Sequence, residues 1–528
     1  MTASVSLSYR PEAVDTTRAR WERDDLMARL WQKDPTVWFD PPRPEINDRL
    51  GWLDLPTSSR ALAPTLLRLS SQALAEGVTD VVLCGMGGSS LAPEVFARTL
   101  PVPDGYPRLT VIDSTHPDAV ASVTEHTDPA ATWYLVSSKS GGTLETMSLF
   151  RHFWARTRAS VTDPGSHFLA ITDPGSSLEQ LAHERGFREV ILADPHVGGR
   201  YSALSAFGLV PAALIGADVG LLLDAAERAA AACSADVPLD ANPGFLVGAY
   251  LGAAAMAGRP IAHFGATAPA TALPIWIEQL IAESTGKDGR GIVPVDGGPM
   301  PSNAADVVTV ALGASPDSSA EVSIAFDDPY DVAGAMVILE IATAVAGEVL
   351  GIHPFDQPDV QVAKTLAHRA MSGDLEDVGP DPVPITAAGT DKLITAALGT
   401  TPLYVSIQAY LPTTPGSDRA LDRMRSLITE ATGRLVTVGH GPRFLHSTGQ
   451  LHKGGPPGGL FIQVTDDPHT TMQVPETEFT FNELIAGQAA GDRAALAERD
   501  RAVVAISVAD DRDTGLDQLA DLIDRALA

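Results

Sequence analysis

The chain has 528 residues, of which 45% are hydrophobic and 20% are charged, which is typical of a soluble globular protein. This length predicts two or three domains with substantial cores. The formal net charge of −29 argues against a protein that binds nucleic acid or an anionic membrane surface. A site for an anionic substrate must build a local positive field, so the few basic residues beside Gly/Ser loops are informative.

No stretch near the N-terminus has the apolar core of a signal peptide. The most apolar windows are interrupted by charged residues such as Asp218, Glu340 and Glu348, so we expect buried helices there and no membrane span. Cys84 and Cys233, the two cysteines of the chain, form neither a disulfide framework nor a zinc motif. We therefore expect a cytoplasmic protein whose two thiols lie in the core.

The first half of the chain predicts a helical arm followed by an α/β domain. Residues 1–60 contain an amphipathic stretch at 16–31 and then a Pro- and Trp-bearing segment, which together predict an N-terminal arm. From 61 to 236, short β-prone runs alternate with helix-compatible segments, and this alternation predicts a mostly parallel sheet covered on both faces. The expected strands are 80–83, 109–112, 133–136, 168–171 and 190–192.

A Pro/Asp/Asn-rich patch at 237–243 predicts a domain boundary, and the pattern of 237–528 predicts a second α/β unit with a C-terminal extension. Residues 333–350 predict a buried helix, and 374–391 predict a long loop. The expected strands are 261–264, 307–311, 322–325, 403–409, 435–438, 460–464 and 503–508. The predicted fold class is α/β, with two doubly wound parallel-sheet domains.

A glycine-rich loop follows the first expected strand, in the segment V-V-L-C-G-M-G-G-S-S-L-A-P at 81–93. Its glycines allow a tight turn from strand to helix. A dinucleotide site is one interpretation, because Asp113 ends the next expected strand. Ser90 stands where that fingerprint has its third glycine, which argues against this interpretation.

A second loop interrupts T-W-Y-L-V-S-S-K-S-G-G-T-L-E-T at 132–146, where a β-prone run changes into small polar residues and then into a helix. Such a loop offers backbone N–H groups, hydroxyls, one ammonium and a helix N-terminus to a single point. Ligands of parallel sheets bind outside the carboxyl ends of strands, where both loops lie. A dianionic phosphate monoester uses all of these groups; the alternative is a structural Gly/Ser loop with an incidental lysine.

The pair of segments GMGGSS and SSKSGGTLET resembles the phosphate site of the glucose-6-phosphate isomerase (phosphoglucose isomerase) family. The resemblance implies two domains of the sugar-isomerase (SIS) type. It also implies that the small residues of both loops bind the substrate phosphate. These residues are Gly88, Ser89, Ser138, Lys139, Ser140 and Thr143.

Two further segments strengthen the resemblance. D-P-H-V-G-G-R-Y-S-A-L-S-A-F-G at 194–208 is similar to the family's glycine–arginine segment, which implies that Gly199 binds substrate and that Arg200 stabilises an enediolate. W-I-E-Q-L-I-A-E-S-T-G-K-D-G-R-G at 276–291 is similar to the segment of the catalytic base, which implies that role for Glu283 and a neighbouring substrate contact for Gln279. Gln279 and Glu283 stand four residues apart, so they share one helix face.

The histidine that opens the sugar ring does not follow the family's chain order. P-F-D-Q-P-D-V-Q-V-A-K at 354–364 resembles the family's closing signature and implies an active-site role for Lys364, but the only histidine between Glu283 and Lys364 is His353, in a context that does not match. His446, in F-L-H-S-T-G-Q, is the candidate for ring opening, and His452 is the second choice. This order resembles the isomerase half of bacterial transaldolase–isomerase fusions, and we expect no transaldolase half here.

The resemblance implies reversible isomerisation of glucose 6-phosphate and fructose 6-phosphate through a cis-enediol. His446 would open the ring with help from Lys364, Glu283 would move the proton, and no metal or cofactor would be needed. The resemblance also implies a homodimer. Two other interpretations stay open, a non-catalytic sugar-phosphate-binding regulator and an isomerase that also acts on mannose 6-phosphate.

Overall fold

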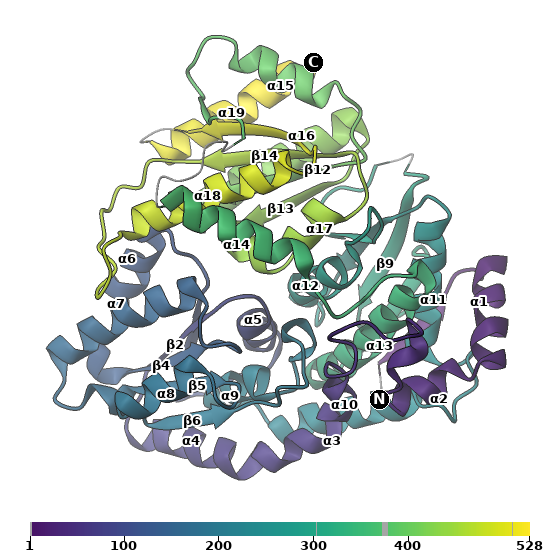
Figure 1. The fold of residues 1–528 in the computed structure, drawn as a ribbon, viewed down its shortest axis with the longest axis horizontal. Helices are drawn as coiled ribbons and strands as arrows, with labels where there is room; N and C mark the ends of the chain where they lie inside the picture. The colour runs from purple at the N-terminus through teal and green to yellow at the C-terminus, as the bar shows by residue number, and fades with distance from the viewer. Residues whose placement is uncertain (1–2, 302–303, 372–378, 509–510, 528) are drawn as a thin grey trace.

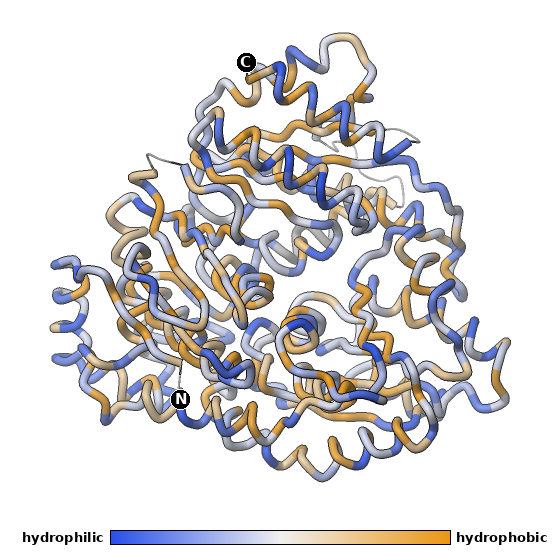
Figure 2. The backbone as a smooth tube through the Cα atoms, turned by 180° about the vertical axis from the view of Figure 1, so that it is seen from behind, coloured by the Kyte–Doolittle hydropathy of each residue, from blue (hydrophilic) through white to orange (hydrophobic). Residues whose placement is uncertain are grey.

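Three five-stranded sheets organise the chain, each with helices packed on it (Figure 1). The computed structural model describes residues 3–301, 304–371, 379–508 and 511–527, and it leaves the side chains of 360–364 and 368 undescribed. The predicted α/β class and the parallel sheets are confirmed. Hydrophobic residues follow the inner strands, and hydrophilic residues gather on the outer helices (Figure 2).

The first sheet has the strand order β3-β2-β4-β5-β6, and all its pairs are parallel. Val81 and Leu83 pack on one face of β2, and Val82 and Cys84 pack on the other, so both faces are buried as predicted. The strands are β2 (Asp80–Gly85), β3 (Arg108–Ile112), β4 (Thr132–Ser137), β5 (Phe168–Thr172) and β6 (Glu189–Leu192). The helices are α4 (Ala63–Ala75), α5 (Leu91–Thr99), α6 (Pro117–Glu125), α7 (Leu144–Ser160), α8 (Ser177–Glu184) and α9 (Ala206–Leu214).

The second sheet has the order β1-β10-β9-β7-β8, in which only β1 is antiparallel. Its strands are β1 (Ser4–Leu7), β7 (Ile261–Ala266), β8 (Val293–Asp296), β9 (Val307–Gly313) and β10 (Val322–Ala325). Its main helices are α10 (Val219–Ala232), α11 (Pro243–Met256), α12 (Leu273–Thr285) and α13 (Val332–Leu350). In the described part of the chain, α13 is the one helix that is apolar and long enough to cross a membrane. It lies in the apolar segment Pro329–Leu350, and 89% of the 18-residue apolar stretch of this segment is buried inside the fold.

The N-terminal arm belongs to the second sheet. It contributes β1 as an edge strand, which the amphipathic pattern of 16–31 did not predict. Its helices are α1 (Glu12–Arg23), α2 (Leu26–Trp31) and the short α3 (Leu55–Ser58). The indole N–H of Trp21 donates to the buried carboxylate of Glu348 at 2.8 Å, and that of Trp31 donates to the carbonyl of Cys233 at 2.8 Å. These bonds tie α1 and α2 to the helices under this sheet.

The predicted C-terminal extension forms a third parallel sheet with the order β11-β15-β14-β12-β13 and a hydrophobic cluster of its own. Its strands are β11 (Val383–Pro384), β12 (Tyr404–Tyr410), β13 (Val436–His440), β14 (Gly459–Thr465) and β15 (Ala502–Ser507). Its helices are α14 (Pro358–Met371), α15 (Thr390–Leu398), α16 (Pro415–Thr432), α17 (Gly449–Gly454), α18 (Phe481–Ala497) and α19 (Arg512–Leu527). Part of the predicted loop at 374–391 lies outside the described residues, and the rest contains β11 and the start of α15.

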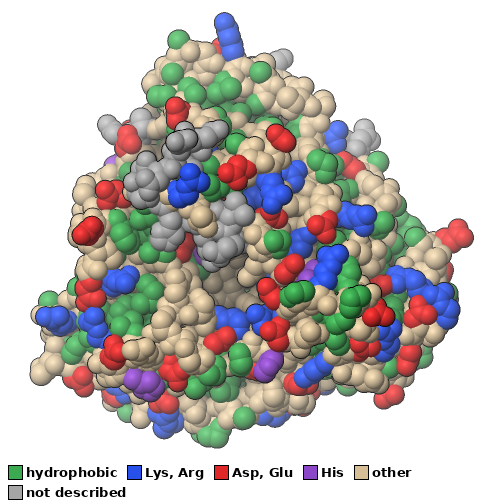
Figure 3. Space-filling view, in the orientation of Figure 1, with side chains coloured by type: hydrophobic (Ala, Val, Ile, Leu, Met, Phe, Trp, Pro, Cys, Tyr) green, Lys and Arg blue, Asp and Glu red, His purple; other side chains and the backbone are tan. Residues whose placement is uncertain are grey.

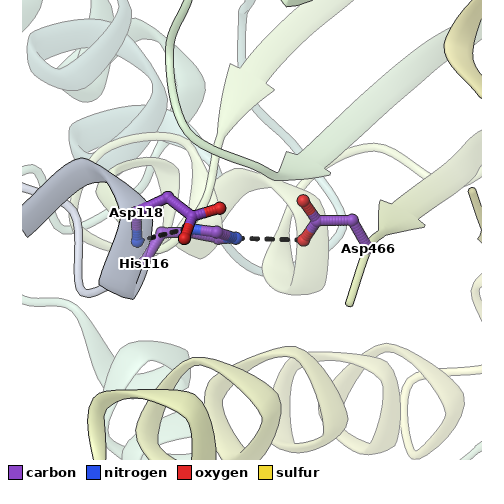
Figure 4. A group of neighbouring side chains, drawn as sticks. All are labelled: His116, Asp118 and Asp466. Atoms are coloured by element: carbon purple, nitrogen blue, oxygen red, sulfur yellow. Dashed lines mark hydrogen bonds and ion pairs between the residues drawn. The ribbon is translucent and has the colours of Figure 1, made fainter. Parts of the chain in front are cut away.

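A buried polar joint connects the first and third sheets (Figure 4). His116, which caps the N-terminus of α6, lies with Nε2 3.0 Å from the carboxylate of Asp466, just after β14. Arg512, at the start of α19, donates to Asp466 and to Asp118 at 2.5 and 2.6 Å. His116, Asp118 and Asp466 are close enough to share a cation, but the guanidinium already places positive charge between the two carboxylates.

We expect Arg512→Ala to lower the free energy of unfolding by about 3 kcal/mol, because it leaves two poorly exposed carboxylates without their counter-charge. Urea unfolding followed by circular dichroism measures the loss. Arg525→Ala, on the exposed end of the same helix, is the matched control and should change little. Equal midpoints for both variants would show that the joint does not stabilise the docking of the third sheet.

Candidate active site

The glycine loop after β2 lies against two other segments of the chain. Gly87 has φ +54°, and a Cβ on it would lie 2.6 Å from the carbonyl oxygen of His446. A Cβ on Gly88 would lie 2.0 Å from the carbonyl oxygen of Gly199. Only glycine permits either approach, so both loop positions are required by tertiary contacts and not only by the turn. Ser89 follows them and is buried.

The second loop joins β4 to α7 beside the first, because β2 and β4 are neighbours in the sheet. The hydroxyls of Ser138 and Thr143 lie 3.0 Å apart, and Ser140 is exposed. The ammonium of Lys139 contacts the carboxylate of Asp173 and the carbonyl of Pro195. The loop therefore presents hydroxyls and a lysine at one sheet edge, and the lysine is held there by Asp173.

Arg200 lies in the 3₁₀ turn Gly199–Tyr201 and is 3% exposed. Its guanidinium donates to the hydroxyl of Ser284 at 2.8 Å and to the side chain of Gln357 at 2.9 Å. It also donates to the carbonyls of Pro354 and Asp356. The same group lies 3.4 Å from the carboxylate of Glu283. Arg200 is thus fixed from several sides next to the candidate base.

Gln279 and Glu283 share the buried face of α12, as their spacing predicts. The amide of Gln279 donates to the Glu283 carboxylate at 3.0 Å and to the carbonyl of His446 at 2.9 Å. Its own oxygen has no hydrogen-bond partner among the described residues. An acceptor left open at this point is available to a hydroxyl of a substrate.

His446 ends the 3₁₀ turn η9 (Arg443–His446), which belongs to the third sheet. Its Nε2 lies 2.9 Å from the carboxylate of Glu145, which also accepts from Gln488 at 2.7 Å. A carboxylate on one ring nitrogen fixes the orientation of an imidazole. Glu145 was missed by sequence reasoning, because an acidic residue in the first turn of α7 has an ordinary explanation in the helix dipole.

His452, the second choice for ring opening, lies elsewhere. Its ring packs against Phe444 and Phe461, and its Nδ1 lies 3.1 Å from the amide of Gln408 in β12. Burial and the neighbouring Lys453 hold the pKa of His452 well below its usual value, so the ring is neutral. Of the two histidines, His446 is the one whose backbone carbonyl contacts Gln279.

Lys364 and Lys287 are the remaining lysines of the motifs. Lys364 lies in α14, and its side chain is outside the described residues. Lys287 is 4% exposed, contacts the carbonyl of His353 and lies 2.8 Å from the carboxylate of Asp356. Burial and the nearby Arg200 lower the pKa of Lys287 to about 7. Sequence reasoning did not single it out, because nothing in G-K-D-G-R signals burial.

The dinucleotide interpretation required a free carboxylate at Asp113. Asp113 is buried, accepts from the hydroxyl of Ser90 at 3.1 Å and lies 3.4 Å from Arg443 of the third sheet. Burial raises the pKa of this carboxyl. Its carboxylate is used in contacts between the first and third sheets, so it is not available to bind the ribose of a dinucleotide.

On the face seen in Figure 3, the surface is hollowed near the centre, and both basic (Lys, Arg) and acidic (Asp, Glu) side chains lie around the hollow. The positive charges near Glu283 belong to the buried Arg200 and Lys287. On a chain with a net charge of −29, an anionic substrate requires such local positive charge.

Comparisons with known proteins agree on one family. The sequence model of phosphoglucose isomerase matches residues 71–300. A glucose-6-phosphate isomerase of Rubrobacter xylanophilus is 28% identical over 420 residues, 66% of this chain and 94% of that protein. One of Thermus thermophilus is 30% identical over 304 residues, 56% of this chain and 68% of that protein.

Solved structures give the same result for the fold. A hypothetical protein of Thermus thermophilus superposes with a TM-score of 0.60 and 25% identity, covering 70% of this chain and 100% of that one. A glucose-6-phosphate isomerase of Chlamydia trachomatis superposes with a TM-score of 0.59 and 19% identity, covering 71% of this chain and 89% of that one. Both leave more than a quarter of this chain without a counterpart.

We expect Gly88→Ala to lower the free energy of unfolding by about 2 kcal/mol, since the added methyl would collide with the backbone of Gly199. Gly199→Ala is the matched control, because a Cβ there meets nothing within 4 Å. Thermal unfolding of both variants measures the difference. A Gly88→Ala variant as stable as Gly199→Ala would contradict the close approach of the two loops.

Proposed function

The chain belongs to the phosphoglucose isomerase family and is an aldose–ketose isomerase that interconverts glucose 6-phosphate and fructose 6-phosphate, and we propose that Glu283 is its catalytic base. The observation that carries this proposal is the convergence of Glu283, Gln279, Arg200 and His446 beside two small-residue loops. The four residues come from three segments far apart in the sequence: the turn Gly199–Tyr201, helix α12 and the turn Arg443–His446. They meet only because the three sheets pack together.

The two loops bind the phosphate in this proposal. Ser138 and Thr143 supply hydroxyls, Gly88 and Ser89 supply backbone N–H groups, and Lys139 supplies positive charge. The carboxylate of Asp173 binds the ammonium of Lys139, so the substrate phosphate competes with this carboxylate for the lysine. Binding of this remote group positions the sugar carbons over α12, which lowers the entropic part of the barrier.

His446 opens the sugar ring by passing a proton to the ring oxygen as the C1 or C2 hydroxyl loses one. Glu145 supports this role, because its carboxylate contacts the imidazole and orients it. The assisting role of Lys364 in ring opening rests on the family resemblance alone. Ring opening exposes the carbonyl that the second step requires.

Glu283 then removes the proton from C2 of the aldose and returns it to C1, which gives the ketose; the reverse direction runs through the same cis-enediol. The negative charge on the enediolate oxygen forms next to Arg200, whose guanidinium is already fixed by Ser284 and Gln357. A preorganised donor of this kind contributes about 3 kcal/mol to the transition state. Gln279 holds the carboxylate of Glu283 in place for both transfers.

A homodimer, which the resemblance implies, stays a prediction. His446 lies in the same chain as Glu283 and contacts it through Gln279. This arrangement supports a site that takes its ring-opening histidine from the third sheet of its own subunit. A partner subunit is not needed to supply that residue.

Glu283→Gln should abolish turnover in a coupled assay of fructose 6-phosphate to glucose 6-phosphate, with a loss of about 10³-fold or more, because the amide cannot accept the C2 proton. The isosteric amide should leave sugar-phosphate binding intact, measured as protection against thermal unfolding. Glu125→Gln, on an exposed position of α6, is the control. Near-normal turnover of the Glu283→Gln variant would show that Glu283 is not the catalytic base. If the wild-type protein binds sugar phosphate but shows no turnover, the protein is a regulator.

His446→Asn should lower kcat by about 10²-fold with little change in KM, because ring opening loses its acid–base group while the phosphate contacts remain. Glu145→Gln should lower kcat less, since it removes only the orienting charge. Steady-state kinetics of both variants measures the order. A His452→Asn variant that loses as much kcat as His446→Asn, at equal stability, would contradict the assignment.

A further inference from the structure

A second cavity, of about 390 Å³, lies between the third sheet and the helices of the other two sheets. Its walls are α5, α12, α16 and the edge strand β13. None of the residues assigned to the active site lines it. The turn η9 separates the two, because Arg443 of this turn lines the cavity and His446 at its other end reaches Glu145.

Two carboxylates in the cavity wall form no ion pair with a described residue. Glu278 of α12 and Asp296 at the end of β8 both line the cavity. Their side chains form no hydrogen bond or ion pair with any residue in the described ranges 3–301, 304–371, 379–508 and 511–527. Carboxylates that are partly removed from water normally have such a partner.

The arginines of the cavity and His440 are already paired with other acids, and His452, which also lines the cavity, is neutral. Arg443 is held by Glu94 and Asp113. The remaining pairs are Arg98 with Glu94 at 3.1 Å, Arg425 with Asp422 at 2.7 Å and His440 with Asp418 at 3.3 Å. Glu278 and Asp296 are therefore the acidic groups of the cavity wall that have no ion-pair partner among the described residues.

Thr437 is an independent sign of a missing ligand. It lines the cavity from β13, is 6% exposed, and its hydroxyl has no hydrogen-bond partner among the described residues. A buried hydroxyl of this kind is normally satisfied by a ligand or an ordered water. Apolar side chains complete the lining: Leu91, Ile275, Leu421, Val438 and Phe444.

We propose that this cavity binds a small organic cation, an aliphatic amine whose ammonium groups pair with Glu278 and Asp296 and whose methylenes contact the apolar lining. The volume lies in the range of small-molecule sites. Thr437 would hydrogen-bond an ammonium. An inorganic cation suits the cavity less well, because the one described group of three metal-type ligands within reach of each other is His116, Asp118 and Asp466 at the other joint.

Binding of an ammonium in this cavity should be coupled to the release of a proton from Glu278. Burial and the nearby Asp296 raise the pKa of Glu278 to about 8, against the opposing effect of Arg443 and Arg425. Burial raises the pKa of Asp296 as well. Glu278 is therefore mostly protonated at pH 7, and an ammonium that pairs with it makes it ionise. Binding should release close to one proton at pH 7 and fewer as the pH rises above 8.

The test is calorimetric titration of the full chain with 1,4-diaminobutane at pH 7, in two buffers of different ionisation enthalpy and without sugar phosphate. We expect saturable binding with proton release. Glu278→Gln and Asp296→Asn should each weaken binding by about tenfold or more, since each removes one charge from the ion pair. Glu430→Gln, on the exposed side of α16, is the matched control and should bind as the wild type does.

Three results would overturn the proposal. The first is equal binding of the uncharged isostere 1,4-butanediol. The second is unchanged binding of the diamine by a folded Glu278→Gln variant, whose amide imitates the protonated acid and should melt with the wild type. The third is no binding of the diamine at all, including the case in which only Mg²⁺ binds. The titration contains no isomerase substrate, so its outcome is independent of the catalytic assignments.

Discussion

The side-chain amide of Gln279 is the point at which the three sheets meet. It belongs to α12 of the second sheet, it donates to the carbonyl of His446 from the third, and it lies against Gly87 of the first. It also holds the carboxylate of Glu283. One buried amide thereby fixes the candidate base, the segment of the candidate histidine and the first glycine loop relative to one another. Proton transfer depends on such positioning, because small displacements of the reacting groups lower the rate steeply.

The candidate active site contains buried positive charges, although the whole chain is strongly acidic. The chain carries a net charge of −29, yet Arg200 and Lys287 are both almost fully buried near Glu283. Their cost of desolvation is offset by carbonyls and by Asp356. An anionic enediolate would then meet fixed donors in place of water. This is the arrangement by which an acidic protein binds and transforms a phosphorylated sugar.

The third sheet connects several parts of the molecule. It carries His446, Arg443 and the acid that pairs with His116, so it contacts the active site, the second cavity and the first sheet at once. Some of its contacts with the other sheets are charged pairs with little exposure, such as Arg443 with Glu94 and Arg512 with Asp118, and such pairs set orientation more than they add stability. Docking of this sheet and the geometry of the active site are therefore parts of one arrangement.

Local sequence determined the elements and most of the chemistry. Strand and helix periodicity predicted β2, β4, β12 and β14, because burial on both faces leaves continuous apolar runs. The spacing of Gln279 and Glu283 put them on one face for the same kind of reason. Tertiary structure alone decided which strands share a sheet, that β1 joins the second sheet, and that the extension is a third one. It also decided which histidine lies beside Gln279, that Glu145 orients its ring, and that Lys287 is buried. Pairing between distant segments depends on packing across the whole chain, and no local period encodes it.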